Sequence, residues 1–247
     1  MRSILIILIT LLVSFSQAKA QQKAFVPGIT LIGIKGGFTT SNLWGSNVND
    51  SLSNGGSAKY KSGFNLGICA NSMLGKYFWL KHDLFLVEKG SVLTINDTAR
   101  HVDYKSDLKL LYIDIYPCSP TFHYKGFQLF VGPYLGGLTR ASIQRENSAG
   151  AIYTDKSIYA TSTTFKLYTQ RIDLGYVAGL EYEFNNGFNL SFRYVRGYVP
   201  LIENPLQQIH QLKIYNKSFN FSIGYTWGRE KGLKIKKKNE SPPPPGY

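Results

Sequence analysis

The sequence predicts an all-β fold, a transmembrane antiparallel up-and-down β-barrel of about eight strands. Residues 171–198 form two runs in which apolar and polar side chains alternate, joined by Asn185-Asn186-Gly187. This pattern is typical of a hairpin whose two faces meet different environments. Each run is longer than the usual ~5–6 residues of a globular strand and is long enough to cross a bilayer at a tilt. Similar runs recur along the chain, with long and short connections in turn.

The polarity of this hairpin indicates which face is inside. Asp173, Glu181 and Glu183 lie on one face of residues 172–184, while leucine and aromatic side chains lie on the other. Charged side chains are costly in hydrocarbon, so we expect them to face a lumen and the apolar side chains to face lipid. A soluble ligand-binding barrel would place its apolar face inside, and this polarity disfavours it.

The first half of the chain contains four runs with strand periodicity, which are residues 29–40, 62–74, 77–90 and 105–116. A short turn at Gly75-Lys76 is expected between the second and the third. We expect Pro117 and Pro120 to form the turn after the fourth strand, because proline cannot donate a ladder hydrogen bond.

The second half contains four more runs, which are residues 127–140, 172–184, 188–198 and 212–227. Pro133 lies inside the fifth strand and predicts a β-bulge there. The Ser/Thr-rich segment 141–165 follows, and we expect it to contain an extension of the flanking strands above the membrane.

The connections and the aromatic residues both support closure with eight strands. Long and short connections alternate, as in an outer-membrane barrel with long extracellular loops and short periplasmic turns. Aromatic side chains gather near both ends of the strands, as expected at the two membrane interfaces. The periplasmic group is Tyr77, Phe78, Trp79, Tyr182, Phe184, Phe188, Tyr225 and Trp227, and the other group is Phe38, Tyr104, Tyr168, Tyr194 and Tyr198.

The two ends of the 247-residue chain have other compositions. Residues 1–20 read as a signal peptide, with a basic start, a short apolar run and an Ala18-Lys19-Ala20 cleavage site. Residues 21–228 form the predicted outer-membrane barrel. Residues 229–247 are basic and then proline-rich, which predicts a disordered periplasmic tail. We therefore expect the mature protein, cleaved near Ala20, in the cell outer membrane of a Gram-negative bacterium.

The formal net charge of +13 favours anionic partners. Outer-membrane lipid and lipopolysaccharide are the expected ones. No nucleic-acid-binding module is recognisable, and an exported protein would rarely meet such a target.

Four short blocks resemble the PorT-like outer-membrane β-barrel family, whose members are porin-like proteins with eight-stranded barrels. They begin with residues 33–42 (GIKGGFTTSN) and 83–90 (DLFLVEKG). The third is Tyr112-Ile113-Asp114-Ile115-Tyr116-Pro117 with residues 132–136, and the fourth is Asp173-Leu174-Gly175 with Gly179, Arg193 and Tyr194. The resemblance covers about residues 29–227 and implies the barrel. It leaves the function open.

The candidate site is a network of charged side chains that face the lumen. An eight-stranded barrel is just wide enough for its own side chains to fill, so opposite charges are expected to pair there. The predicted members are Lys35, Lys81, Asp83, Asp114, Arg171, Asp173, Glu181, Glu183 and Arg193. Paired, they would close the barrel. The alternative is a narrow polar path for protons, ions or small solutes.

The remaining chemistry is sparse. Cys69 and Cys118 both fall on the polar side of their strands, so a disulfide and two separate thiols both remain possible. His101 and His210 lie in predicted extracellular loops with serines and acids nearby, but no nucleophile motif accompanies them. No metal-ligand spacing or phosphate loop is present. We expect no enzyme activity and no cofactor.

The sequence supports a structural or interaction role, with long extracellular loops and a charge-filled lumen. Two other functions remain open. One is a membrane component of a protein-secretion assembly, which predicts a stable protein partner. The other is a narrow porin, which predicts a conductance that depends on Asp173 and Arg193.

Overall fold

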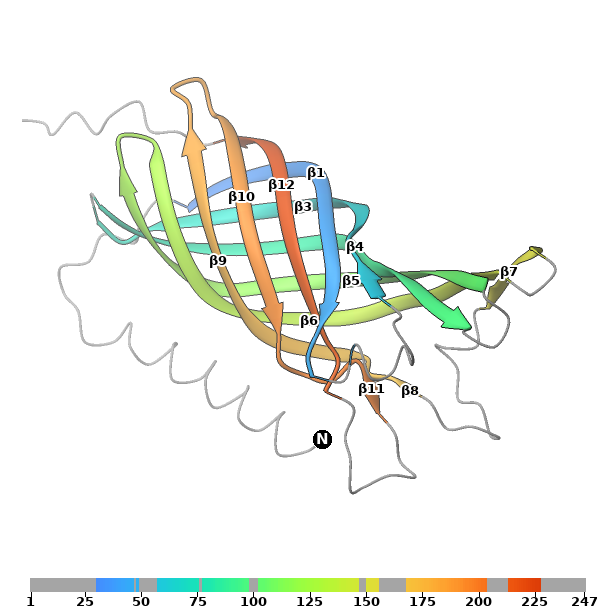
Figure 1. Ribbon diagram of the computed structural model, residues 1–247. Helices are drawn as coiled ribbons and strands as arrows, with labels where there is room; N and C mark the ends of the chain where they lie inside the picture. Colours follow the sequence, from blue (N-terminus) through green and yellow to red (C-terminus); the bar gives the residue numbers. More distant parts are fainter. Residues whose placement is uncertain are drawn as a thin grey trace, which may run out of the picture.

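The computed structural model describes residues 30–46, 48, 57–75, 77–97, 102–146, 150–155, 168–203 and 213–227 (Figure 1). Eight long strands dominate this part of the chain. They are β1 (Thr30–Trp44), β3 (Lys61–Met73), β4 (Phe78–Asp97), β5 (Val102–Tyr124), β6 (Phe127–Glu146), β9 (Ile172–Glu183), β10 (Phe188–Gly197) and β12 (Tyr215–Trp227). Four short strands accompany them, β2 (Ser57–Lys59), β7 (Ile152–Asp155), β8 (Tyr168–Thr169) and β11 (Ile202–Glu203).

The eight long strands form a closed ring. Each pairs antiparallel with the next long strand along the chain, and β1 pairs with β12 to close the sheet. In that closing seam Gly37 lies opposite Ser222. The predicted fold class, an eight-stranded antiparallel barrel, is confirmed. Within the described ranges no helix has the length and apolar character to cross a membrane.

Polar and apolar side chains lie on opposite faces of the sheet, as the alternation in the sequence predicts. On β9, Asp173 and Glu181 are buried inside the ring, whereas Leu180 is 42% exposed on the outside. On β1, Lys35 is 1% exposed and Ile34 is 51% exposed. The outer surface therefore offers an apolar band to lipid, and the interior holds a set of buried charged side chains.

The Asn-Asn-Gly hairpin is also confirmed. The backbone N–H of Gly187 donates to the carbonyl of Phe184 at 3.0 Å, and Phe184 and Phe188 pair across the turn. Gly187 has φ +91°, a conformation that L side chains rarely adopt. Glycine is thus the residue that allows this tight connection between β9 and β10.

The predicted turn at Pro117 and Pro120 is wrong. Strand β5 continues through both prolines to Tyr124, and the chain turns at Lys125-Gly126, where both residues have positive φ. The β5–β6 ladder is interrupted between Ile115 and Thr121, so the missing proline N–H groups fall where no ladder partner is needed. Pro133 of β6 faces the same interruption, and the additional residue of this bulge belongs to β5.

The bulge also changes the position of Cys118. Pro117 and Cys118 both lie between the inward-facing Tyr116 and Ser119, so the simple alternation fails there and Cys118 leaves the lumen. Cys69 stays buried inside, and β4 separates the strands of the two cysteines. Both are free thiols.

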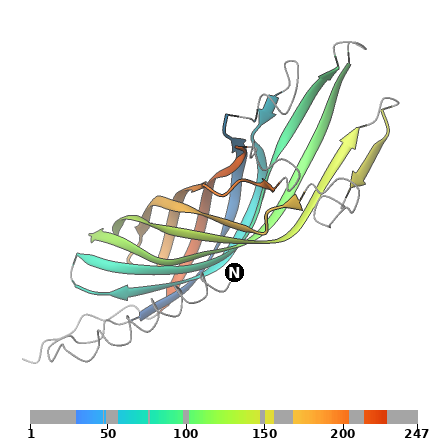
Figure 2. The same ribbon diagram turned by 90° about the horizontal axis from the view of Figure 1, so that it is seen from below.

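Three strands are longer than the barrel requires. β4, β5 and β6 have 20, 23 and 20 residues and extend together past the rim, where β2 and β7 pair with their outer parts (Figure 2). The predicted extension within residues 141–165 is therefore present in β6 and β7. Backbone pairing along the extended strands satisfies their polar groups beyond the rim.

Several predictions concern residues outside the described ranges. These are the signal peptide in residues 1–20, the start of the barrel domain at residue 21, the tail in residues 229–247, the middle of the segment 141–165, His101 and His210.

Candidate functional site in the barrel lumen

The lumen contains most of the charged residues that the sequence points to. Eight of the nine candidates are buried inside the ring, on β1, β4, β5, β9 and β10. They are Lys35, Lys81, Asp83, Asp114, Asp173, Glu181, Glu183 and Arg193. Seven of them belong to two clusters, one nearer the tight turns and one nearer the long loops, and Glu183 belongs to neither.

The first group, which we call the turn-side cluster, consists of Lys35, Lys81, Asp83, Glu181 and Arg193. Glu181 is its centre, because one of its oxygens, Oε2, lies 2.5 Å from Lys35 Nζ and 2.6 Å from Lys81 Nζ. All three side chains are fully shielded from solvent. Two ammonium groups that share one carboxylate oxygen draw β1, β4 and β9 together across the lumen.

Arg193 completes the turn-side cluster. Its Nη2 lies 2.8 Å from Asp83 Oδ2. The guanidinium group also stacks over aromatic rings, 4.4 Å from the ring centre of Phe85 and 5.5 Å from that of Phe130. Such contacts stabilise a cation most where water is excluded. Arg193 therefore fills the middle of the barrel as much by packing as by charge.

The second group, the loop-side cluster, consists of Lys89, Asp114, Asp173 and Tyr134. Lys89 Nζ lies 2.8 Å from Asp114 Oδ2 and donates to the hydroxyl of Tyr134 at 2.5 Å. That hydroxyl in turn donates to Asp173 Oδ2 at 3.1 Å. Asn216 donates to the same oxygen at 3.2 Å. The cluster is thus one continuous hydrogen-bonded chain across five strands.

The formal charges of the two clusters complement each other. The turn-side cluster has three cations and two carboxylates, and the loop-side cluster has one cation and two carboxylates. Their formal sums are therefore +1 and −1, so the two clusters compensate each other. Such compensation matters in a narrow interior, since an unbalanced buried charge is costly. Glu183 lies outside both clusters and adds one further buried carboxylate.

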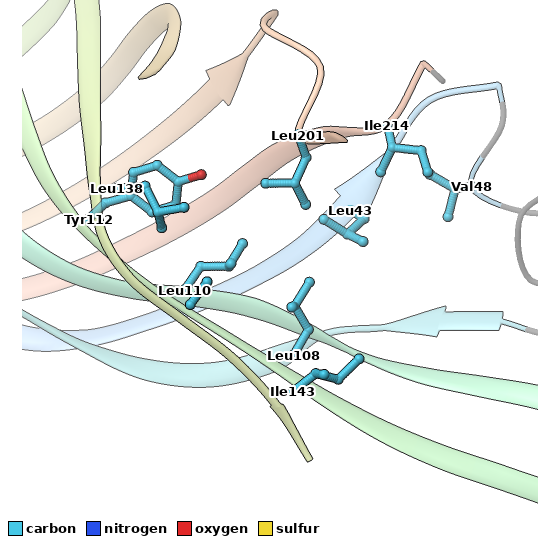
Figure 3. Packing of buried hydrophobic residues seen from close by; sticks show 10 residues of the cluster. Leu43, Val48, Leu108, Leu110, Tyr112, Leu138, Ile143, Leu201 and Ile214 are labelled. Carbon is cyan, nitrogen blue, oxygen red and sulfur yellow. The ribbon is translucent and has the colours of Figure 1, made fainter. Parts of the chain in front are cut away.

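Beyond the loop-side cluster, toward the long loops, apolar side chains fill the barrel. Figure 3 shows them converging from β1, β5, β6 and the segments that precede β11 and β12. The members of this apolar plug are Leu43, Val48, Leu108, Leu110, Tyr112, Leu138, Ala141, Ile143, Leu201 and Ile214. Leu110 is completely buried. The plug fills the interior on the loop side with apolar side chains.

Some polar atoms in the lumen have no protein partner in the described part of the chain. They include Asp83 Oδ1, Glu181 Oε1, Asp173 Oδ1 and both amide atoms of Asn71. Buried groups of this kind ordinarily bind ordered water. The polar part of the lumen therefore has unused hydrogen-bonding capacity on the turn side of the plug.

One candidate lies elsewhere. Arg171 is exposed, because it precedes the first residue of β9 at a bend, where the strand alternation does not yet apply. Its carbonyl accepts from the N–H of Leu138 at the rim. The aromatic Trp79, expected at the lipid interface, is instead buried in the lumen and stacks on His123 with ring centres 4.0 Å apart.

Sequence reasoning missed Lys89, although the signal was present. It lies an even number of residues from Lys81 and Asp83 on β4, so the alternation that selected those two also selects Lys89. Tyr112 and Tyr116 share the inward parity of Asp114 on β5, and both are buried as that parity predicts, whereas Tyr134 of β6 was missed.

The charged side chains of the lumen can neutralise one another and fill the interior of the barrel. Their carboxylates form ion pairs with lysine and arginine side chains. Among the described residues no group of three or more His, Cys, Asp or Glu side chains is placed to hold a metal. The absence of enzyme activity and of a cofactor stays a prediction.

Comparison with known proteins gives a family match. A family model described as "Outer membrane protein beta-barrel domain" matches residues 15–203. No curated protein matches the sequence.

Several solved structures are similar at low identity. Ail, the attachment invasion locus protein of Yersinia pestis, in complex with the heparin analogue sucrose octasulfate, is 13% identical with a TM-score of 0.43, over 82% of this chain and 100% of that chain. Neisserial surface protein A is 13% identical with a TM-score of 0.39, over 80% and 95%. OprG from Pseudomonas aeruginosa is 14% identical with a TM-score of 0.38, over 82% and 98%.

Proposed function

The chain belongs to the outer membrane protein beta-barrel domain family, and from this premise we propose that it is a closed barrel that anchors an extracellular interaction surface. Family membership is consistent with the outer membrane of a Gram-negative bacterium. The observation that carries the proposal is the filled lumen, in which two neutralising charge clusters lie below an apolar plug.

The closed lumen argues against a role as an open pore. Wide aqueous channels belong to barrels with many more strands, whereas eight strands enclose only side chains. Here those side chains pair across the ring through Glu181, Arg193 and Lys89. The barrel wall and its contents thus act as a rigid stem.

The extended strands supply a surface for interaction. β4, β5 and β6 carry the sheet beyond the rim, and β7 adds a short outer strand to β6. On β7, Ile152 is 73% exposed and Tyr153 is 50% exposed. An apolar and an aromatic side chain on an outer strand favour contact with another surface.

Conductance across a planar lipid bilayer tests the closed lumen. We expect the purified full chain to insert without a steady current above the lipid baseline. A steady current that changes in Asp173→Asn, but not in Glu146→Gln on the extension outside the barrel, would overturn the proposal. Insertion is verified in the same preparation by the heat-dependent mobility shift of folded barrels in gels.

A steady current that changes in Asp173→Asn would instead support a narrow porin, the second candidate function. The unpartnered polar atoms of Asn71, Asp83 and Glu181 favour it, because they could align water along the turn-side half of the lumen. In that case Arg193→Gln should change the ion selectivity, since Arg193 occupies the centre of the path.

A component of a protein-secretion assembly is the remaining alternative, and membership of the PorT-like branch stays a prediction with it. A pull-down of the tagged protein from outer membranes in mild detergent tests this alternative. A stoichiometric protein partner would support an assembly component, whereas a free monomer would favour a self-standing barrel. Outer-membrane lipid and lipopolysaccharide remain the expected non-protein partners.

A further inference from the structure

A belt of aromatic side chains surrounds two cations on the outer surface of the barrel. The belt spans β9, β10, β12, the end of β1 and the residue before β3, on the side of the long loops. Its rings contact one another at centre distances of 4.8–6.3 Å. Its members are Trp44, Tyr60, Tyr176, Tyr194, Tyr198, Tyr215 and Phe219. Such belts mark the level of lipid headgroups.

The two cations are Arg196 of β10 and Lys217 of β12. They are register partners in the β10–β12 ladder, so their side chains leave the sheet side by side on the same face. The neighbouring Val195 and Ser218 are buried in the lumen, which places Arg196 and Lys217 on the outer face. Like charges directly opposite each other destabilise a sheet unless an anion compensates them.

No carboxylate of the described chain forms an ion pair with either cation. The Arg196 guanidinium lies 3.8 Å from the ring centre of Trp44, and Lys217 Nζ lies 5.4 Å from that of Tyr60. The buried Nε of Arg196 has no hydrogen-bond partner in the described part of the chain. The pair is thus held in place by rings and retains its full positive charge.

An apolar groove lies on the same strands, farther toward the tight turns. It has a volume of about 410 Å³, and Phe192 of β10 and Phe221 of β12 line its loop-side end, while Leu190 and Ile223 line it nearer the turns. Phe192 and Phe221 lie four residues from Arg196 and Lys217, a separation of about 13 Å along a strand. Cations at headgroup level with an apolar groove at hydrocarbon level match a molecule with an anionic head and an acyl tail.

We propose that Arg196 and Lys217 bind the phosphate group of a glycolipid of the outer leaflet, with an acyl chain that follows β10 and β12 as far as the loop-side end of the groove. Arginine presents a planar fork that matches phosphate oxygens, and lysine adds a point charge. The loop side of the barrel faces the outer leaflet, whose lipid carries sugar-linked phosphates. This site gives the lipid contact of the proposed function a location, and it does not depend on whether the lumen is closed.

Native mass spectrometry of the full chain in detergent tests the site, with diphosphoryl lipid A as the probe. We expect Arg196→Gln and Lys217→Gln each to weaken lipid A binding about fivefold, and the double variant more than either. Lipid A stripped of its phosphates should bind more weakly to the unmodified chain. Millimolar inorganic phosphate should displace diphosphoryl lipid A only in part, because it lacks the acyl chain.

Lys125→Gln is the matched control. Lys125 Nζ lies 5.3 Å from the ring centre of Tyr124 at the opposite end of the barrel, which reproduces the lysine–tyrosine contact of Lys217. Its lipid A affinity should equal that of the unmodified chain.

Thermal unfolding without lipid checks that the variants fold. Lys217→Gln should be at least as stable as the unmodified chain, because one of two neighbouring like charges is removed. Unchanged affinity of the double variant, or equal binding of phosphate-free lipid A, would overturn the site. Neither result would affect the conductance experiment.

Discussion

At the scale of the residue, Glu181 is the carboxylate that bonds two lysine side chains in the lumen. Its Oε2 bonds Lys35 and Lys81, and Arg193 packs in the same cluster through Asp83. A buried ion pair adds little net stability when it is compared with a hydrophobic replacement. Removal of one partner is different, because it leaves the other charges buried and uncompensated.

Glu181→Gln should therefore destabilise the barrel by about 3–5 kcal/mol. The amide keeps the shape but removes the charge that compensates Lys35 and Lys81. Urea unfolding in lipid vesicles, followed by tryptophan fluorescence, measures the change. Glu183→Gln, two residues away on the same face, is the control. Its carboxylate accepts from Gln128 at 3.1 Å, and we expect a loss of no more than about 1.5 kcal/mol. Equal effects of the two variants would contradict a special role for Glu181.

Glycine makes this dense interior possible. A Cβ atom on Gly179 would lie 2.5 Å from the ring of Phe130, and one on Gly197 would lie 2.3 Å from Asp173 Oδ1. Both contacts are shorter than side chains tolerate. The glycines on the inward face therefore leave space for their bulky and charged neighbours.

At the scale of the element, a row of apolar residues faces outward on five neighbouring strands. Leu129, Leu180, Phe192, Phe221 and Phe38 are successive register partners on β6, β9, β10, β12 and β1. On β9 and β10 the row lies between the aromatic residues of the turn side and the belt of the loop side. Leu180 and Phe192, with the neighbouring Phe221, are therefore expected near the midplane of the membrane.

Leu180→Arg and Phe221→Arg should each destabilise the folded barrel in membranes by about 2–4 kcal/mol, because each places a charge at that level. Folding into vesicles at a series of urea concentrations measures the loss. The control is Phe184→Arg, which is 42% exposed next to the turn-side end of β9. There the cost should be about 0–1 kcal/mol. Folding of the two midplane variants like the unmodified chain would contradict the outward assignment.

Element boundaries depended on turn chemistry that hydrophobic periodicity does not reveal. The Asn-Asn-Gly turn was predictable because Gly187 supplies the positive φ that the hairpin needs. Lys125-Gly126 performs the same role with a lysine at φ +49°, an unusual residue for that conformation. The prolines at 117 and 120 were the stronger local signal, but the ladder interruption opposite Pro133 accommodates them within β5.

At the scale of the whole molecule, the ring has two unequal ends. Tight turns join β3 to β4, β5 to β6 and β9 to β10, while the long connections and the extended parts of β4, β5 and β6 lie at the other end (Figures 1 and 2). An outer-membrane barrel keeps its short turns in the periplasm. The extension with β7 is therefore expected outside the cell.

Labelling of intact cells tests this orientation. In a chain with Cys69→Ala and Cys118→Ala, a membrane-impermeant maleimide should react with Tyr153→Cys on β7 and not with Asn185→Cys in the β9–β10 turn. Tyr153 is 50% exposed and Asn185 is also exposed, so access to solvent is not the difference. Both variants should react after lysis. Labelling of Asn185→Cys in intact cells with Tyr153→Cys protected would reverse the orientation.

The sequence predicts which charged residues face the lumen, because that depends only on the alternation within each strand. Parity along β1, β4, β5, β9 and β10 identified eight of the buried charged residues, since a strand in a barrel wall has only two faces. Parity could not identify their partners. Lys35 and Lys81 meet at Glu181 from positions 146 and 100 residues distant in the chain, and nothing local encodes that pairing.

The sequence by itself determined the class of the fold, the hairpin at residues 184–188, and the face of most side chains. These follow from local periodicity and from the cost of a charge in lipid. The tertiary structure decided the two charge clusters, the apolar plug, the bulge at Pro117 and the pairing of Arg196 with Lys217. Each of these depends on the register between strands, and ring closure sets that register by joining β1 to β12 at one particular offset.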